Sequence, residues 1–419
     1  MALRSRSAAS AALCCLLANT GHPCAAQQPL SERLGFYQWV GTPVQGSSDD
    51  LLTPARRYAT ATGARVFRLY LGARYDYRHH TGYRPAPGAS PAQILALPHY
   101  QAVLDDPGLH TIILTTYTSA DYGAGPDDLN LLRPWTPAAE QIEREQILAL
   151  CEFLYARWGG EPKTVVIANS EADDKMLEIM NYTGSPEQCI ATMLSWTRTR
   201  HDAITAARAT HPKARLRVLH GFEISLVNLA LIRKGTAFEK NPSGTWSALR
   251  DVVPRVHFDL LLYSTYESIN SPYETRNSNV DASQTGVRLR RDLDRIRERS
   301  RTSLSAEGRR LFGDRFVAAG ELGFARDRFE LLPTGGVLPR LLSAIQAAAD
   351  WGCPYIVLWQ VFDAPKAGGE QFGFGLVDRQ GRFPTLKPAL RGCDSIQACL
   401  TSSRALSDGQ AGRDQSPRR

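Results

Sequence analysis

Two glutamates lie at or just beyond the ends of short apolar runs of the kind that form buried strands. Glu171 comes shortly after Thr164–Ala168, and Glu321 comes directly after Arg315–Gly320. A carboxylic acid can give or take a proton, and an ionised carboxylate can attack an electrophilic carbon. Two carboxyl groups whose surroundings push their pKa values apart can divide these roles within one site. Glu171 and Glu321 are therefore the first candidates for catalysis.

Other polar and aromatic side chains occupy similar positions along the chain. Arg68 lies within an early apolar run, and Trp359 lies near the end of the last one. An aromatic face suits the floor of a sugar subsite, and a pair of carboxylates flanking the scissile bond is what glycoside hydrolysis requires. Further residues that we expect to line the subsites are Gln38, Trp39, Tyr117 and His220.

Eight short apolar runs recur along the chain, and they predict the strands that would position these side chains. They are Leu34–Val40, Arg65–Leu71, Thr111–Thr116, Thr164–Ala168, Arg215–His220, His257–Tyr263, Arg315–Gly320 and Tyr355–Gln360. Most are rich in Val, Ile, Leu, Phe or Tyr and are too short for helices. Uniformly apolar strands are typical of a parallel sheet that is buried on both faces.

Segments of helical periodicity separate these runs. The clearest are Pro137–Trp158, Pro186–Ala207, Arg288–Phe312 and Val337–Trp351, with weaker ones at Asp49–Thr62, Pro91–Leu104, Trp246–Val253 and Lys387–Arg391. The alternation predicts an α/β fold, a (β/α)8 TIM barrel with a single catalytic domain, whose active site lies at the C-terminal ends of the strands. A doubly wound open sheet is the alternative, but no G-x-G-x-x-G turn follows an early strand.

Composition and charge limit the class of protein. The chain has 419 residues, of which 43% are hydrophobic and 22% charged, as in ordinary globular domains. The apolar run Ala8–Ala18 is shorter than the roughly 20 residues of a membrane span, so no spanning helix is expected. Without the two arginines of residues 1–26 the net charge falls from +7 to +5, which is too weak to indicate a nucleic-acid partner.

The two ends of the chain differ from the middle. Residues 1–26 combine Arg4 and Arg6, the apolar run and a small-residue cleavage site, so we expect a signal peptide and a secreted or periplasmic protein. Residues 27–400 then form the barrel, and residues 401–419 form a disordered C-terminal tail. The sequence does not indicate an oligomeric state.

Cysteine and histidine spacing gives no sign of a metal or cofactor site. Eight cysteines become five after cleavage, which excludes a fully paired set. Cys393 and Cys399 are close enough to bridge a short loop, whereas Cys151 and Cys353 lie in apolar elements and are expected to be buried thiols. The adjacent pair His79–His80 is interpreted as an exposed loop. We expect no cofactor and no metal.

The order of these residues resembles that of the clan A retaining glycoside hydrolases, a superfamily of (β/α)8 enzymes. The resemblance covers roughly Gly35 to Leu390 and rests on short motifs. It implies that Glu171 at strand four is the acid/base and Glu321 at strand seven the nucleophile. It also implies that Arg68 supports the nucleophile, Tyr263 hydrogen-bonds it, and Trp359 is the strand-eight tryptophan.

One position departs from the pattern of that superfamily. Its acid/base glutamate usually follows an asparagine directly, but Ser170 separates Asn169 from Glu171 here. Strand alternation would still place Asn169 and Glu171 on the same face, with Asn169 available to a sugar hydroxyl. Glu223, after the fifth run, is the alternative candidate for the acid.

The resemblance implies a secreted glycoside hydrolase that cleaves an O-glycosidic bond in an oligo- or polysaccharide by a retaining double displacement. The expected partner is therefore a carbohydrate substrate. A non-catalytic carbohydrate-binding TIM barrel is the alternative, because it would keep the aromatic cleft and lose one of the carboxylates. Neither the sugar nor the linkage follows from the sequence.

Overall fold

Eight parallel strands close into a barrel, which confirms the predicted fold. A computed structural model describes residues 29–39, 50–71, 89–118, 135–270, 282–324, 337–362, 364–365 and 371–372. The strands follow one another around the barrel as β1, β2, β3, β4, β5, β8, β9 and β10, and β10 pairs with β1. Their bounds are β1 Leu34–Gln38, β2 Val66–Leu71, β3 Thr111–Thr116, β4 Thr164–Ala168, β5 Arg217–Ile224, β8 Leu260–Ser264, β9 Val317–Leu322 and β10 Ile356–Trp359.

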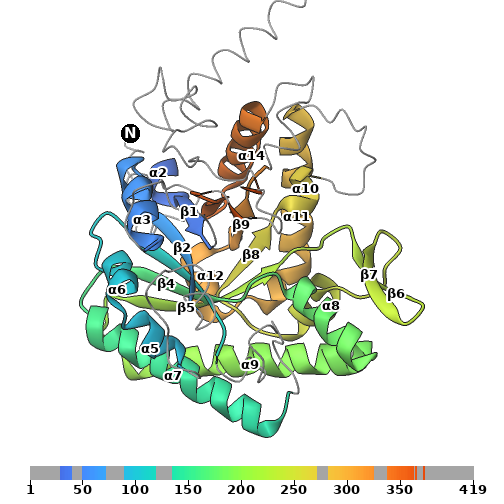
Figure 1. Cartoon of the computed structure of the whole chain (residues 1–419), viewed down its shortest axis with the longest axis horizontal. Helices are drawn as coiled ribbons and strands as arrows, with labels where there is room; N and C mark the ends of the chain where they lie inside the picture. The colour runs from blue at the N-terminus through green and yellow to red at the C-terminus, as the bar shows by residue number, and fades with distance from the viewer. Residues whose placement is uncertain are drawn as a thin grey trace, which may run out of the picture.

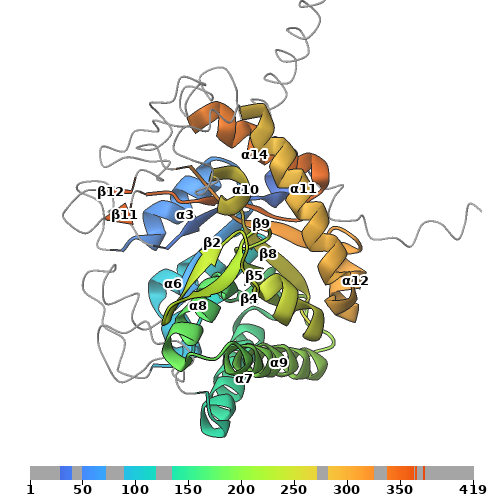
Figure 2. The same ribbon diagram turned by 90° about the vertical axis from the view of Figure 1, so that its right-hand side faces the viewer.

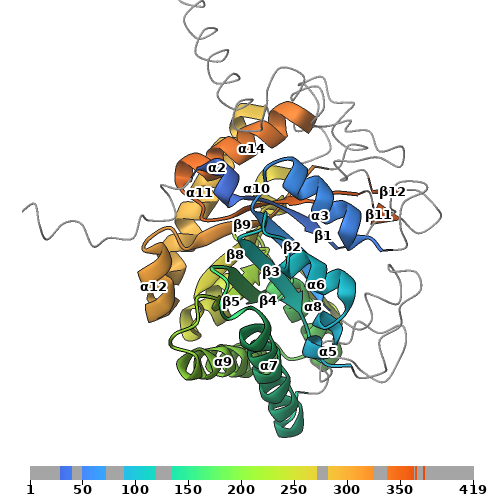
Figure 3. The same cartoon turned by 90° about the vertical axis from the view of Figure 1, so that its left-hand side faces the viewer.

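Helices cover the outside of the barrel. They are α2 Leu30–Arg33, α3 Leu52–Ala61, α5 Pro91–Leu95, α6 Pro98–Leu104, α7 Pro137–Trp158, α8 Ala172–Thr183, α9 Pro186–Thr210, α10 Tyr266–Asn270, α11 Ala282–Ser300, α12 Ala306–Phe312 and α14 Val337–Trp351. Long helix α7 packs against α9 on one side of the barrel, and α11 packs against α14 on the opposite side (Figures 2 and 3). The core is formed where the apolar faces of these helices meet the buried strands.

Two helices that the sequence predicted as continuous are broken. The segment Arg288–Phe312 divides into α11 and α12, because Leu304 pairs with Phe258 and Ser305 caps α12 by accepting from the Gly308 amide. The segment Pro91–Leu104 divides at Pro98, which begins α6. A proline lacks the amide that a continuing helix requires.

A hairpin and a longer strand were not expected from the sequence. Strand β5 continues past His220 to Ile224, and the chain then forms the antiparallel pair β6 Ala230–Lys234 and β7 Ala237–Asn241. This hairpin projects from the side of the barrel at the right of Figure 1. The weak helix expected at Trp246–Val253 is present as two short helical segments, the π-helix η3 Ala248–Val252 and the 3-10 helix η4 Val253–Arg255. A two-residue pair, β11 Ala364–Pro365 with β12 Gln371–Phe372, lies outside the barrel sheet.

Cys151 and Cys353 are buried free thiols, as expected, and Cys189 is a third. Burial raises the pKa of each of these thiols to about 12, so they remain protonated at neutral pH. The segments 1–26 and 401–419, the helix at Lys387–Arg391, the pair Cys393 and Cys399, and His79–His80 lie outside the described residues.

Candidate active site

Glu321 lies near the C-terminal end of β9, with its side chain directed toward the inside of the barrel mouth. The side chain is 4% exposed, and its Oε1 lies 3.5 Å from the Arg68 guanidinium. Burial raises the pKa of Glu321 above its ordinary value, and the negative charges of Glu223 and Glu171 raise it further. Arg68 and the nearby Tyr266 hydroxyl act in the opposite direction.

Glu171 reaches the same region from the start of α8. Its backbone adopts φ 27° and ψ 78°, in the left-handed region that residues with a side chain seldom occupy. The Ser264 hydroxyl donates to Glu171 Oε1 at 2.6 Å. Since Ser264 pairs with Glu321 in the register of β8 and β9, one serine connects the two glutamates.

The pKa of Glu171 is raised to about 8. Burial is the largest cause, followed by the negative charge of Asp174 and a hydrogen bond to it, with a smaller contribution from Glu223. Ser264 partly offsets these effects because it donates to the carboxylate. A glutamate with this pKa is mostly protonated at neutral pH, which is the state that a general acid requires.

A third carboxylate lies between the two. Glu223 near the end of β5 is fully buried and accepts from Arg68 Nη1 at 2.5 Å and Nη2 at 2.8 Å. Arg68 is also fully buried, donates to the Thr115 hydroxyl at 2.9 Å, and lies over the Tyr37 ring at 4.3 Å. The cluster therefore contains three carboxyl groups and one guanidinium, of which Glu171 alone is partly exposed.

Asn169 was expected to be available to a sugar hydroxyl, but its side chain hydrogen-bonds to the protein backbone instead. Its Oδ1 accepts from the Glu223 amide at 2.9 Å, and its Nδ2 donates to the Glu223 carbonyl at 3.0 Å. The amide group therefore bridges β4 to β5. Strand β4 ends at Ala168, so the alternation expected through Asn169 and Glu171 does not apply. Glu171 instead reaches the cluster through its unusual backbone conformation.

Two predicted site residues point away from the cluster. The His220 ring faces His201 of α9, with ring centres 5.5 Å apart. The Tyr263 hydroxyl bonds to the Ser268 hydroxyl at 2.7 Å, and Ser268 in turn donates to Asp292. Successive side chains of a strand alternate between its faces, so Ser264 and Glu223 point inward while Tyr263 and His220 point outward. The tyrosine that contacts Glu321 is Tyr266.

Aromatic side chains form a continuous group beside the cluster. Trp39 stacks on Tyr70 with ring centres 5.4 Å apart, and Trp359 meets Trp39 edge-on at 5.4 Å. Both tryptophans are partly exposed, which a stacking surface for a sugar requires. Tyr117 is buried. Its hydroxyl hydrogen-bonds to the backbone of Ser170, and its ring stacks on Trp196 of α9.

Gln38 is also buried and accepts from the Phe362 amide at 3.2 Å.

The sequence did not predict a role for Ser264 or Tyr266, nor the contact of Glu223 with Arg68. A signal for Ser264 was available, because a residue one position beyond Tyr263 must face the other side of the strand.

The described parts of the chain contain no group of three or more His, Cys, Asp or Glu side chains arranged to hold a metal ion. Among those same parts, no helix combines the length and apolar character needed to cross a bilayer.

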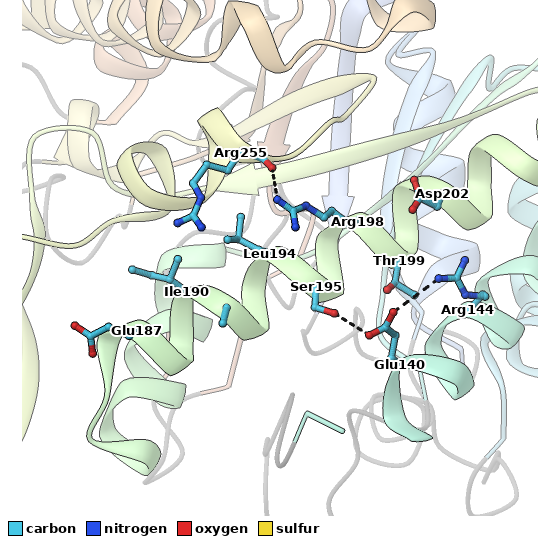
Figure 4. Close-up of a pocket in the computed structure, with 11 residues that line it drawn as sticks. Glu140, Arg144, Glu187, Ile190, Leu194, Ser195, Arg198, Thr199, Asp202 and Arg255 are labelled. Atoms are coloured by element: carbon cyan, nitrogen blue, oxygen red, sulfur yellow. Dashed lines mark hydrogen bonds and ion pairs between the residues drawn. The ribbon is translucent and has the colours of Figure 1, made fainter. Parts of the chain in front are cut away.

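A groove of about 690 Å³ lies elsewhere on the molecule, between α7 and α9 (Figure 4). Ser195 donates to Glu140 at 2.9 Å on one wall, and Arg198 donates to the Arg255 carbonyl at 3.0 Å on the other. None of its lining residues belongs to the carboxylate cluster. The groove is thus a separate surface feature on the outside of the barrel.

Comparisons with known proteins give distant matches to solved structures. No protein-family profile and no curated protein sequence matches this chain. Among solved structures, the chain is similar to a GH5 xyloglucan-specific endo-β-1,4-glucanase from a metagenomic library, at 14% identity and a TM-score of 0.47, over 89% of this chain and 97% of that one.

It is also similar to a GH5-4 broad specificity endoglucanase from Clostridium acetobutylicum, at 9% identity and a TM-score of 0.46, over 91% of this chain and 99% of that one. A β-glucuronidase from Bacteroides uniformis matches at 8% identity and a TM-score of 0.47, over 85% of this chain and 34% of that one. At these identities the reaction has to be argued from the site itself.

Proposed function

We propose that this chain is a secreted glycoside hydrolase that cleaves an O-glycosidic bond with net retention of configuration. The observation that carries the proposal is the cluster in which Arg68 lies between Glu223 and Glu321, while Ser264 of the neighbouring strand donates to Glu171 at 2.6 Å. One protonated and one ionised carboxyl group in the same cleft is the requirement of glycosidase chemistry.

The proton belongs on Glu171 because the two glutamates have different neighbours. Glu171 shares a hydrogen bond with the anionic Asp174, which favours the protonated form. Glu321 lies 3.5 Å from a guanidinium and near the Tyr266 hydroxyl, and both favour its ionised form. Burial raises both pKa values, and we assign the negative charge to Glu321 because it is the glutamate that lies beside the guanidinium.

In the first step, Glu321 attacks the anomeric carbon while Glu171 passes its proton to the departing glycosidic oxygen. The carbon–oxygen bond to the leaving group breaks, and a covalent glycosyl ester forms at Glu321. In the second step, Glu171, now ionised, takes a proton from water. The water oxygen attacks the same carbon and releases Glu321, which restores both groups.

Retention requires the two carboxyl groups to lie roughly 5–5.5 Å apart. Ser264 supports a short separation, because it pairs with Glu321 across adjacent strands and hydrogen-bonds to Glu171. The partly exposed Trp39 and Trp359 would provide the stacking surface for a sugar ring, and we assign substrate binding to them.

Other predicted site residues would support this chemistry indirectly. Arg68 would stabilise the nucleophile, whereas Asn169 and Tyr117 would hold the loop that carries Glu171. Secretion is proposed from residues 1–26 alone.

The test is hydrolysis of a panel of aryl β-glycosides and plant, fungal and bacterial polysaccharides, with product anomers followed by NMR. Wild type is expected to turn over at least one substrate with retained configuration. Glu321→Ala should abolish turnover, and Glu171→Ala should slow it by about 10²–10⁴-fold, with azide restoring activity on activated substrates. Activity surviving both substitutions would refute the assignment. Binding without turnover by wild type would instead indicate the non-catalytic barrel.

A further inference from the structure

Glu223 accepts more hydrogen bonds than either of the other two carboxyl groups of the cluster. Its carboxylate accepts both Arg68 Nη atoms, at 2.5 and 2.8 Å, and also the backbone amide of Glu171 at 3.1 Å. The side chain is fully buried. Because its oxygens are occupied by a guanidinium and an amide, Glu223 does not fit the role of the alternative acid.

The donors that Glu223 holds belong to the two proposed catalytic glutamates. Arg68 Nη1, which Glu223 binds, is the same atom that lies 3.5 Å from Glu321. The amide that Glu223 binds is that of Glu171, at a residue with φ 27°. A single carboxylate therefore contacts both the cation beside the nucleophile and the backbone of the acid.

The surrounding fold keeps Glu223 in this position. Asn169 pairs with both its amide and its carbonyl. Gly320 leaves the necessary space, because a Cβ at that residue would lie 2.7 Å from Glu223 Oε1 and 3.3 Å from Arg68 Nη1. Arg68 also donates to the Gly320 carbonyl at 3.0 Å, so the residue before Glu321 is part of the same arrangement.

We propose, resting on the function proposed above, that Glu223 is a positioning residue that orients Arg68 toward Glu321 and fixes the backbone of Glu171 for proton transfer. It touches neither the substrate nor the reacting atoms. Its carboxylate divides the charge of Arg68 between two partners and holds the acid in a conformation that the chain would otherwise seldom adopt.

The charge of Glu223 acts on both glutamates. The groups that face it are Arg68 from β2, Glu321 from β9, Glu171 from the start of α8, and the hydroxyls of Tyr37 and Tyr266. Its negative charge raises the pKa of Glu321 and, to a smaller extent, that of Glu171. Replacing it with a neutral side chain of the same shape should lower both pKa values.

The test compares kcat/KM against pH for wild type, Glu223→Gln and Glu223→Asp, on the best aryl glycoside from the panel above. Glu223→Gln should lower kcat by about 10²-fold with little change in KM, and both limbs of the pH profile should move toward acid by about one pH unit. Glu223→Asp keeps the charge but shortens the side chain, so kcat should fall while both limbs stay near their wild-type positions.

A matched control separates positioning from a general loss of stability. Glu143→Gln breaks another buried ion pair, with Arg200 at 2.6 Å, on helices outside the barrel. This variant should lower the melting temperature and leave both pH limbs unchanged. An active wild type whose pH limbs do not move in Glu223→Gln would overturn this inference and leave the proposed function intact. An inactive wild type would overturn both.

Discussion

The pKa of the Glu171 carboxyl group is set by the groups that surround it. Ser264 donates to it at 2.6 Å, whereas Asp174 and Glu223 place negative charge nearby. Burial together with these two anions outweighs the serine and raises its pKa to about 8. At the scale of single residues, Glu171 and Glu321 are chemically identical. Which of them acts as the acid and which as the nucleophile therefore depends on the groups around each.

The pH dependence of folding stability tests this protonation without any substrate. Because the folded pKa of about 8 exceeds the unfolded value of about 4.3, the folded state binds more protons between these values. Stability is therefore lost as pH rises through this window. Glu171→Gln removes the titration, so its melting temperature should rise relative to wild type between pH 5 and pH 8.5. A constant difference across that range, measured by calorimetry, would contradict the raised pKa.

Gly320 gives a second test at this scale. A Cβ there would lie 2.7 Å from Glu223 Oε1 and 2.9 Å from Leu262 Cβ, so Gly320→Ala must push the ion pair of Arg68 apart. We expect a loss of about 1–3 kcal/mol in the free energy of unfolding, with reduced kcat. Gly160→Ala is the control, because no atom lies within 4 Å of a Cβ at that position. Urea unfolding that shows equal stability for the two variants would refute the close packing.

At the scale of elements, the hairpin of β6 and β7 supplies charge to the site from outside the barrel. Lys240 on β7 forms an ion pair with Asp174 of α8, the residue that shares a hydrogen bond with Glu171. The negative charges of Asp174 and Glu171 both raise the pKa of Lys240. The hairpin thus offsets part of the negative charge that collects around the proposed acid.

Replacing Lys240 tests this contribution. Lys240→Met removes a cation near Glu171, so the pKa of Glu171 should rise and the alkaline limb of kcat/KM should move to higher pH. Lys234→Met is the matched control on the same hairpin, because Lys234 is 74% exposed and pairs only at the surface with Glu239. An alkaline limb that stays in place in Lys240→Met, or that moves equally in both variants, would show that the hairpin does not act on the acid.

The sequence predicted the site only as accurately as it located the end of each strand. Apolar runs located all eight strands, and Glu171, Glu321 and Arg68 do lie in one cluster. The side of the strand was wrong for Tyr263, because β8 ends one residue later than the apolar run does. His220 lies within β5 rather than at its end, because the strand continues to Ile224, and its ring faces outward. Inward and outward positions alternate, so an error of one residue exchanges the two faces.

Other parts of the site depend on contacts that no local pattern indicates. The ion pair of Arg68 with Glu223 joins residues 155 positions apart. The left-handed Glu171 donates its amide to Glu223 of another strand, at 3.1 Å. The β6–β7 hairpin lies where the sequence suggested only a loop between strand and helix. The ion pair follows from the closed barrel, which brings distant strand ends to one rim.

At the scale of the whole molecule, the closed barrel explains why so many charges lie together. Parallel strands direct their C-terminal ends to the same rim, and β2, β5 and β9 contribute Arg68, Glu223 and Glu321 there. Helices such as α7 with α9 and α11 with α14 pack around the outside and exclude water from the strands. The buried surroundings strengthen the interactions among these charges.

The most direct measurement is covalent trapping of the proposed nucleophile. Wild type would be incubated with a set of 2-deoxy-2-fluoro-β-glycosyl fluorides of different sugars, chosen by the hydrolysis panel, and its intact mass and labelled peptide determined. We predict one added glycosyl group, located on Glu321, together with loss of activity and no adduct in Glu321→Ala. An adduct on Glu171 or Glu223, or an active enzyme that forms none and gives the inverted anomer, would contradict the retaining mechanism proposed for this chain.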